Sequence, residues 1–169
     1  MTKNLIPTID ISSLVNQDFN SNKSVKTINK IKKACINIGF FQIVGHGISK
    51  KNIKNICSVG NKFFNSSEKN KKKLAPKKWN YKNKNIYRGY FPNDVNGKEG
   101  LDIGDLKVTK NYAKIKKKQY IEYLNLSKSF NKKSIKILAK YYDENFFLGE
   151  ILFKSIIRLY NKDINNFKL

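Results

Sequence analysis

A short run of β-favouring residues, closed by glycine at both ends, constrains the fold class of this chain most strongly. Residues 40–44 read FFQIV, with Gly39 before them and Gly45 after them. Such a run is typical of a buried strand. On both sides of it, apolar residues recur at steps of three and four, which predicts an amphipathic helix before the strand and another after it. The sequence therefore predicts an α+β fold that alternates helices with short strands.

The same spacing rules place the remaining elements. The first helix begins near Ser24, which suits an N-cap, and ends at Gly39, where a left-handed C-cap is expected. A second helix follows Ser49. Further strands are predicted at residues 6–11, 86–91, 100–104 and 155–160, and further helices at residues 119–142 and 145–152. Residues 66–85 carry eight Lys and are predicted to form a mobile surface segment.

The cysteines and the lack of long apolar runs indicate the cellular compartment that the sequence predicts. Cys35 and Cys57 each fall within a helical apolar stripe, which predicts buried, reduced thiols in a cytoplasmic protein. No run reaches the ~18 apolar residues of a membrane span, and the first ten residues contain no signal-like apolar run.

The charge admits two interpretations. The formal net charge is +23, and 33 of the 35 basic residues are Lys, leaving only Arg88 and Arg158. A genome rich in A and T fills solvent positions with Lys and Asn, whereas a polyanion-binding protein selects for basic side chains. Because sequence-specific readers of nucleic acid depend on the planar fork of Arg, the composition argues against specific nucleic-acid recognition. Weak, salt-sensitive binding to polyanions is still expected, and a basic module for nucleic acid or anionic surfaces is the alternative function.

Four motifs in a fixed order carry a family resemblance. They read IPTIDIS at residues 6–12, ACINIGFFQIVGHGIS at 34–49, YRGYFP at 87–92 and KEGLDIG at 98–104. In this order they resemble the N-terminal region of the isopenicillin N synthase-like iron(II)- and 2-oxoglutarate-dependent dioxygenases. The resemblance implies a non-haem dioxygenase N-terminal domain over residues 1–115. Residues 116–169 would then supply a long helix and the first strand leading to a catalytic barrel.

The complete family fold implies iron(II) and 2-oxoglutarate, bound by a jelly-roll (double-stranded β-helix) barrel. That barrel carries a His-x-Asp pair, a distal His and an Arg-x-Ser pair, none of which can be placed here. The metal needs two imidazoles and one carboxylate, but the sequence contains one histidine, His46. We therefore expect no catalytic residue, no metal ligand and no bound cofactor in this chain, and the resemblance gives His46 a structural role. Independent catalysis is also unsupported, since the sequence has no Ser/His/acid set and no phosphate loop.

The resemblance makes Arg88 and Tyr90 the candidate substrate-binding residues. In some family members this region edges the substrate pocket, where a basic residue can meet a substrate carboxylate. The alternative is that Arg88 packs against a neighbouring aromatic ring or pairs with an acid. Asp102, in its glycine-flanked turn, is expected to cap backbone amides.

The expected product is thus an N-terminal fragment of an oxygenase of small organic molecules. The fragment would be a truncated gene product, a pseudogene remnant or one half of a split enzyme, and in the last case its partner is a separately encoded catalytic barrel. We expect no specific nucleic-acid partner and no membrane span. Short strands of this fragment would edge the barrel, which is itself largely missing. Without it, four apolar side chains are expected to be exposed, namely Leu124, Phe130, Leu138 and Phe147.

Overall fold

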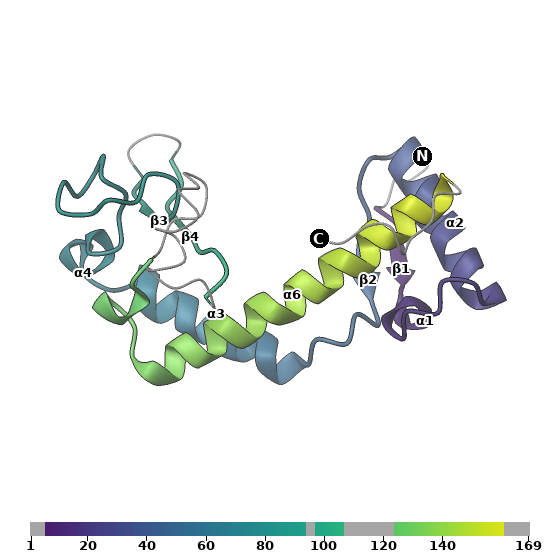
Figure 1. Ribbon diagram of the computed structural model, residues 1–169, viewed down its shortest axis with the longest axis horizontal. Coiled ribbons are helices and arrows are strands. Elements are labelled where there is room, and N and C mark those ends of the chain that lie inside the picture. The colour runs from purple at the N-terminus through teal and green to yellow at the C-terminus, as the bar shows by residue number, and fades with distance from the viewer. Residues whose placement is uncertain (1–5, 94–96, 107–123, 161–169) are drawn as a thin grey trace, which may run out of the picture. The chain divides into compact units, whose positions relative to one another are not determined.

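The computed structural model describes residues 6–93, 97–106 and 124–160 (Figure 1). They divide into two compact units. Unit 1 comprises Met1–Ser49 and Asp143–Leu169, and unit 2 comprises Lys50–Tyr142. The predicted domain boundary between residues 115 and 116 lies outside the described residues and stays a prediction.

Unit 1 is built on a parallel pair of strands, β1 (Thr8–Asp10) and β2 (Gln42–Val44). Both fall within residues predicted to be strands, but the predicted burial of residues 40–44 is wrong, because Phe40, Gln42 and Val44 are exposed. Helices α1 (Ser12–Val15) and α2 (Asn22–Asn37) connect the two strands. The C-terminal part of helix α6 (Lys132–Leu159) completes the unit. The buried core of unit 1 comprises Ile9, Ile11, Leu14, Phe19, Ile28, Ile31, Ala34 and Ile151.

The ends of α2 show how local chemistry sets a helix. Ser21 is the N-cap, and its side chain accepts a hydrogen bond from the Ser24 amide. Ser24, the predicted cap, is buried inside the first turn, where its hydroxyl donates to the Ser13 carbonyl at 3.0 Å. The prediction was therefore three residues late, because a tertiary contact satisfies that hydroxyl. Gly39 adopts the expected left-handed conformation with φ of 83°, and its amide donates to the Ala34 carbonyl.

Unit 2 surrounds a cluster of aromatic rings. It contains α3 (Lys50–Phe64), α4 (Glu68–Lys72), β3 (Gly89–Phe91), β4 (Gly100–Asp102), the 3₁₀ helix η1 (Leu126–Lys128) and the start of α6. At the centre, the Phe63 ring stacks on Phe130 and meets Phe64 and Tyr90 edge-on. These contacts join α3, β3 and the turn before α6 into one core.

The lysine-rich residues 66–85 form an anchored loop and not only a charged surface. Leu74, Ala75 and Pro76 are buried. The side-chain amide of buried Asn83 donates to the carbonyls of Lys73 and Ala75 at 3.0 and 2.6 Å. These bonds and the burial of Leu74 and Ala75 in the unit 2 core attach the loop to the rest of the unit.

Helix α6 corrects two predictions. The helix predicted for residues 119–142 begins only at Lys132 among the described residues, after η1, and residues 119–123 lie outside them. The strand predicted for residues 155–160 is wrong, because α6 continues to Leu159. Ser155 is buried and donates to the Ile151 carbonyl at 2.8 Å, a contact that only a helix allows. The β-branched residues there were misleading because burial on one helix face overrides local propensity.

The exposure of individual side chains corrects further predictions. Cys35 and Cys57 are both exposed, so their predicted burial is wrong. Of the apolar residues expected to be exposed, Phe130 and Leu138 are buried in the unit 2 core and Leu124 is half-buried. Only Phe147 is exposed as expected.

Gly89 offers a test of the unit 2 packing. Its φ is 118°, and an added Cβ would overlap the Leu74 carbonyl oxygen. We expect Gly89→Ala to lower the free energy of unfolding by about 2–4 kcal/mol, measured by urea denaturation. Gly60→Ala is the matched control, because Gly60 lies inside α3 and an added Cβ would meet no other atom. Since alanine favours a helix more than glycine does, this substitution should raise the free energy of unfolding by about 0.5–1 kcal/mol. Equal effects at the two positions would contradict the packing described here.

Candidate functional site

The β3–β4 hairpin brings the candidate residues together. The two strands pair antiparallel, with Gly89 opposite Asp102 and Tyr90 opposite Leu101. The Tyr90 amide also donates to the Leu74 carbonyl at 3.1 Å, which fixes the hairpin against the anchored loop. Gly89 permits this approach because it has no side chain.

Tyr90 is buried, with 1% of its surface exposed, and its hydroxyl belongs to a network of charged groups. The hydroxyl donates to a carboxylate oxygen of Glu99 at 2.7 Å, and an oxygen of Glu68 lies 3.1 Å away. The ammonium of Lys71 lies 2.8 Å from Glu68 and 2.7 Å from Glu99. It also lies 5.2 Å from the centre of the Tyr90 ring. Four side chains from α4, β3 and the residue before β4 therefore satisfy one another; we call them the Lys71 cluster.

The Lys71 cluster shifts the titration of each member in the direction that keeps the charges in place. Hydrogen bonds from Lys71 lower the pKa of Glu68 and of Glu99, and the Tyr90 hydroxyl lowers that of Glu99 further. The same carboxylates raise the pKa of Lys71. Burial, followed by the hydrogen bond to Glu99, raises the pKa of Tyr90 to about 12. At neutral pH the cluster therefore contains two carboxylates, one ammonium and a neutral phenol.

Arg88 lies beside this cluster but makes a different contact. One guanidinium nitrogen of Arg88 lies 2.7 Å from a carboxylate oxygen of Asp102, and both side chains are partly exposed. The Arg88 side chain also passes close to Gly104, where an added Cβ would lie 3.3 Å from Nε. Of the two predicted site residues, only Arg88 reaches solvent, whereas Tyr90 points into the protein.

Sequence reasoning missed Glu68, Lys71 and Glu99. Lys71 was indistinguishable in sequence from its neighbours in a run of lysines. The one local signal was the spacing of three between Glu68 and Lys71, which places the two side chains on the same face of a helix. Asp102 pairs with Arg88, as the alternative interpretation of Arg88 had it.

His46 has a structural contact. Its Nδ1 accepts a hydrogen bond from the Ile48 amide at 3.1 Å, within the turn that follows β2. Gly45 and Gly47, on either side, both have positive φ angles. An added Cβ on Gly45 would meet the Asp10 carboxylate and Ser12, so the turn is packed against the end of β1.

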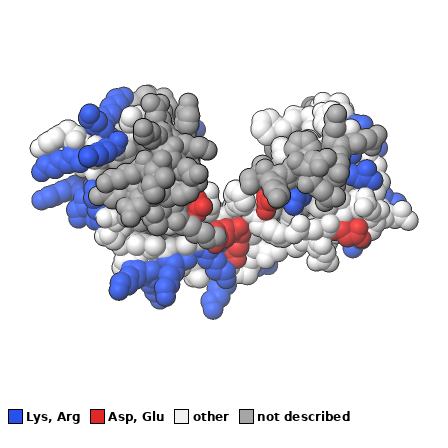
Figure 2. Space-filling view, in the orientation of Figure 1, with Lys and Arg blue, Asp and Glu red and all other residues white. Residues whose placement is uncertain are grey.

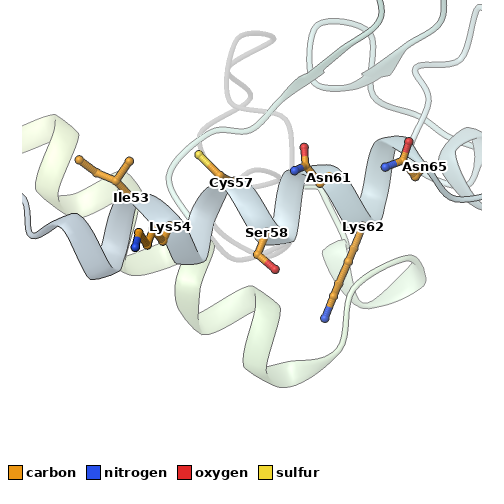
Figure 3. A pocket seen from close by; sticks show the side chains of 7 residues that line it. All are labelled: Ile53, Lys54, Cys57, Ser58, Asn61, Lys62 and Asn65. Carbon is orange, nitrogen blue, oxygen red and sulfur yellow. The ribbon is translucent and has the colours of Figure 1, made fainter.

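A shallow hollow of about 530 Å³ runs along α3 (Figure 3). Six of its lining residues come from this helix and the seventh follows its last residue: Ile53, Lys54, Cys57, Ser58, Asn61, Lys62 and Asn65. The hollow contains one thiol and two ammonium groups but no carboxylate or imidazole. Among the described residues, no group of three or more His, Cys, Asp or Glu side chains could hold a metal ion. No helix in the described part of the chain is both long and apolar enough to cross a membrane.

Comparison with known proteins places this architecture. Residues 6–147 match the family model described as non-haem dioxygenase in morphine synthesis N-terminal. The chain therefore belongs to this family, the N-terminal region of the 2-oxoglutarate- and iron(II)-dependent dioxygenases.

Individual relatives agree with the family match. The chain is 35% identical over 105 residues to homoarginine-6-hydroxylase 2-ODD-C23.2 of Arabidopsis thaliana, covering 58% of this chain and 28% of the relative. It is 33% identical over 88 residues to the 2-oxoglutarate-dependent dioxygenase tropC of Talaromyces stipitatus, covering 52% and 26%. It is 36% identical over 112 residues to a probable iron/ascorbate oxidoreductase of Dictyostelium discoideum, covering 59% and 28%. The matched part thus spans little more than a quarter of the length of these relatives.

The Lys71 cluster makes a testable contribution to stability. We expect Glu99→Gln to lower the free energy of unfolding by about 1–2 kcal/mol at neutral pH, because buried Lys71 loses one of its two carboxylates. The control Asp102→Asn removes a partly exposed ion pair and should cost under about 1 kcal/mol.

The pH dependence of the same variant gives a second readout. Because the folded-state pKa of Glu99 is lowered from 4.5, its contribution is present above that value and is lost as pH falls through the folded pKa. Stability of the unmodified chain should therefore fall more steeply below about pH 4.5 than that of Glu99→Gln. Parallel curves from urea denaturation across this range would contradict the assignment.

Proposed function

We propose that this chain is the N-terminal scaffold of an iron(II)- and 2-oxoglutarate-dependent oxygenase that acts on a small organic molecule. We further propose that it is not catalytic by itself. The family membership supports the first statement. The second rests on one observation, the number of imidazoles that the sequence contains.

The residues present do not fit an iron(II) site of this class. Such a site takes two imidazoles and one carboxylate and leaves positions open for 2-oxoglutarate and oxygen. His46 is the one histidine of the sequence, and its Nδ1 already accepts the Ile48 amide. We therefore propose that iron and 2-oxoglutarate bind to a catalytic barrel that these 169 residues do not contain. The proposal does not depend on whether the same gene or a separate gene encodes that barrel.

Unit 1 has the features of a surface that needs such a partner. Parallel sheets are normally covered on both faces, and a two-stranded sheet is marginal alone. In the β1–β2 pair, Ile9 faces the core, whereas Asp10 and Val44 are exposed. Ile36, in the last turn of α2, is 71% exposed, and Phe40, two residues before β2, is 70% exposed. We propose that these strands join the edge of the barrel sheet, which would cover the exposed apolar residues.

Unit 2 would contribute to the substrate pocket through the β3–β4 hairpin. We propose that Arg88 meets a carboxylate of the substrate, since a guanidinium binds carboxylates through two parallel hydrogen bonds. Asp102 holds the guanidinium from one side, and the Lys71 cluster fixes the strand that follows Arg88. Tyr90, being buried, would act only as a positioning residue.

Iron binding and turnover test the proposed division of labour. The purified chain, incubated with iron(II), ascorbate and 2-oxoglutarate, is expected to form no succinate and to hold no stoichiometric iron. A chimera in which residues 6–147 replace the matching segment of the Arabidopsis homoarginine-6-hydroxylase should bind one iron and consume 2-oxoglutarate. Stoichiometric iron on the isolated chain would refute the proposal, and an inactive but folded chimera would count against the scaffold role.

The same chimera tests Arg88. With homoarginine, an amino acid, as substrate, Arg88→Ala should raise KM by about 10- to 100-fold and change kcat little, because a carboxylate contact binds ground state and transition state alike. Arg88→Lys should restore part of the loss. Lys33→Ala on the exposed face of α2 is the control and should leave both constants unchanged. An unchanged KM in Arg88→Ala would assign Arg88 to the Asp102 pair alone.

A further inference from the structure

Exposed lysines gather on residues 66–85 of unit 2, the anchored loop, which includes α4. Residues 66–85 contain eight Lys and a single acid, Glu68, and only Lys71 among these lysines is buried. Figure 2 shows blue side chains projecting from this part of the molecule. The exposed members are Lys69, Lys72, Lys73, Lys77, Lys78, Lys82 and Lys84. A surface with this excess of positive charge attracts phosphates.

Aromatic rings alternate with these lysines. Residues 77–88, which we call the basic loop, read KKWNYKNKNIYR. The Lys78 ammonium lies 4.6 Å from the centre of the Trp79 ring, and the Lys82 ammonium lies 5.8 Å from that of Tyr81. Tyr81 is 80% exposed. The loop thus presents a flat ring to solvent with a cation beside it.

The backbone of the basic loop is held in place before any ligand arrives. Asn83 is buried: its amide nitrogen donates to two backbone carbonyls, and its oxygen accepts from the Lys128 ammonium at 2.8 Å. The Lys77 amide donates to the Asn85 carbonyl at 2.8 Å. A preformed loop loses little conformational entropy on binding, so its contacts contribute more fully to affinity.

We propose that the basic loop binds single-stranded nucleic acid without sequence preference, an activity separate from the proposed oxygenase role. A single strand offers phosphates for the lysines and unstacked bases for Tyr81. A duplex hides the faces of its bases, and an anionic membrane offers phosphates without flat rings to stack on. Since Arg88 and Arg158 are the only arginines, reading of base edges is not expected.

Fluorescence anisotropy with a labelled oligo(dT) of about 16 nucleotides tests this inference. Changing Lys77, Lys78 and Lys82 together to Gln should weaken binding about tenfold or more. It should also reduce the slope of log affinity against log salt by about 2, since each lost phosphate contact contributes about 0.7. Tyr81→Ala should weaken binding by about 5- to 30-fold without changing that slope, because stacking releases no counterions.

Matched variants separate the loop from net charge alone. Changing Lys26, Lys30 and Lys33 on the exposed face of α2 to Gln removes the same charge, and Tyr160→Ala removes another exposed ring. Both controls should retain most of the affinity, and circular dichroism should show every variant folded. Equal losses from the two lysine triples, no effect of Tyr81→Ala, or binding to phosphatidylserine vesicles but not to the oligonucleotide would each overturn the proposal.

Discussion

Burial of the Lys71 ammonium is the constraint on which unit 2 depends. An ammonium taken out of water must be surrounded by opposite charge and hydrogen-bond acceptors. Glu68 supplies these from the same helix, Glu99 from the residue before β4, and the Tyr90 ring lies beside the cation. One charge thereby ties α4 to both sides of the hairpin. Arg88 directly precedes β3, so the contacts of Lys71 with Glu99 and Tyr90 also position the partly exposed Arg88 guanidinium.

Unit 1 is governed by a different constraint, the need of a parallel sheet for cover on both faces. Helix α2 and the end of α6 cover one face through Ile28, Ile31 and Ile151. The exposed residues of β1 and β2 face the other way, and a β-sheet edge with unpaired backbone groups accepts a further strand. This asymmetry agrees with a chain that spans little more than a quarter of its relatives. The exposed strand residues of unit 1 and the hairpin of unit 2 are the features on which the proposed scaffold role rests.

The sequence predicted well where a single residue type has a local consequence. Gly39 and Gly45 marked the limits of the segment that contains β2, because glycine readily adopts the positive φ found there. Prediction failed where distant neighbours decide. Ser24 lost its expected capping role to a bond with the Ser13 carbonyl. The β-branched residues after Ser155 became helical because one face of α6 is buried in the core.

The sequence by itself determined the α+β class, the family and the absence of a second imidazole, because each depends on local spacing or on a count of residues. Through the family resemblance, it also named Arg88 and Tyr90 as candidate substrate-binding residues. Only the tertiary structure decided that Tyr90 is buried while Arg88 remains at the surface. It likewise selected Lys71 from 33 chemically identical lysines. The physical reason is that burial and charge pairing depend on residues that are distant in the sequence and become neighbours only when the chain folds. Glu99 lies 28 positions after Lys71, and Tyr90 lies 22 positions after Glu68.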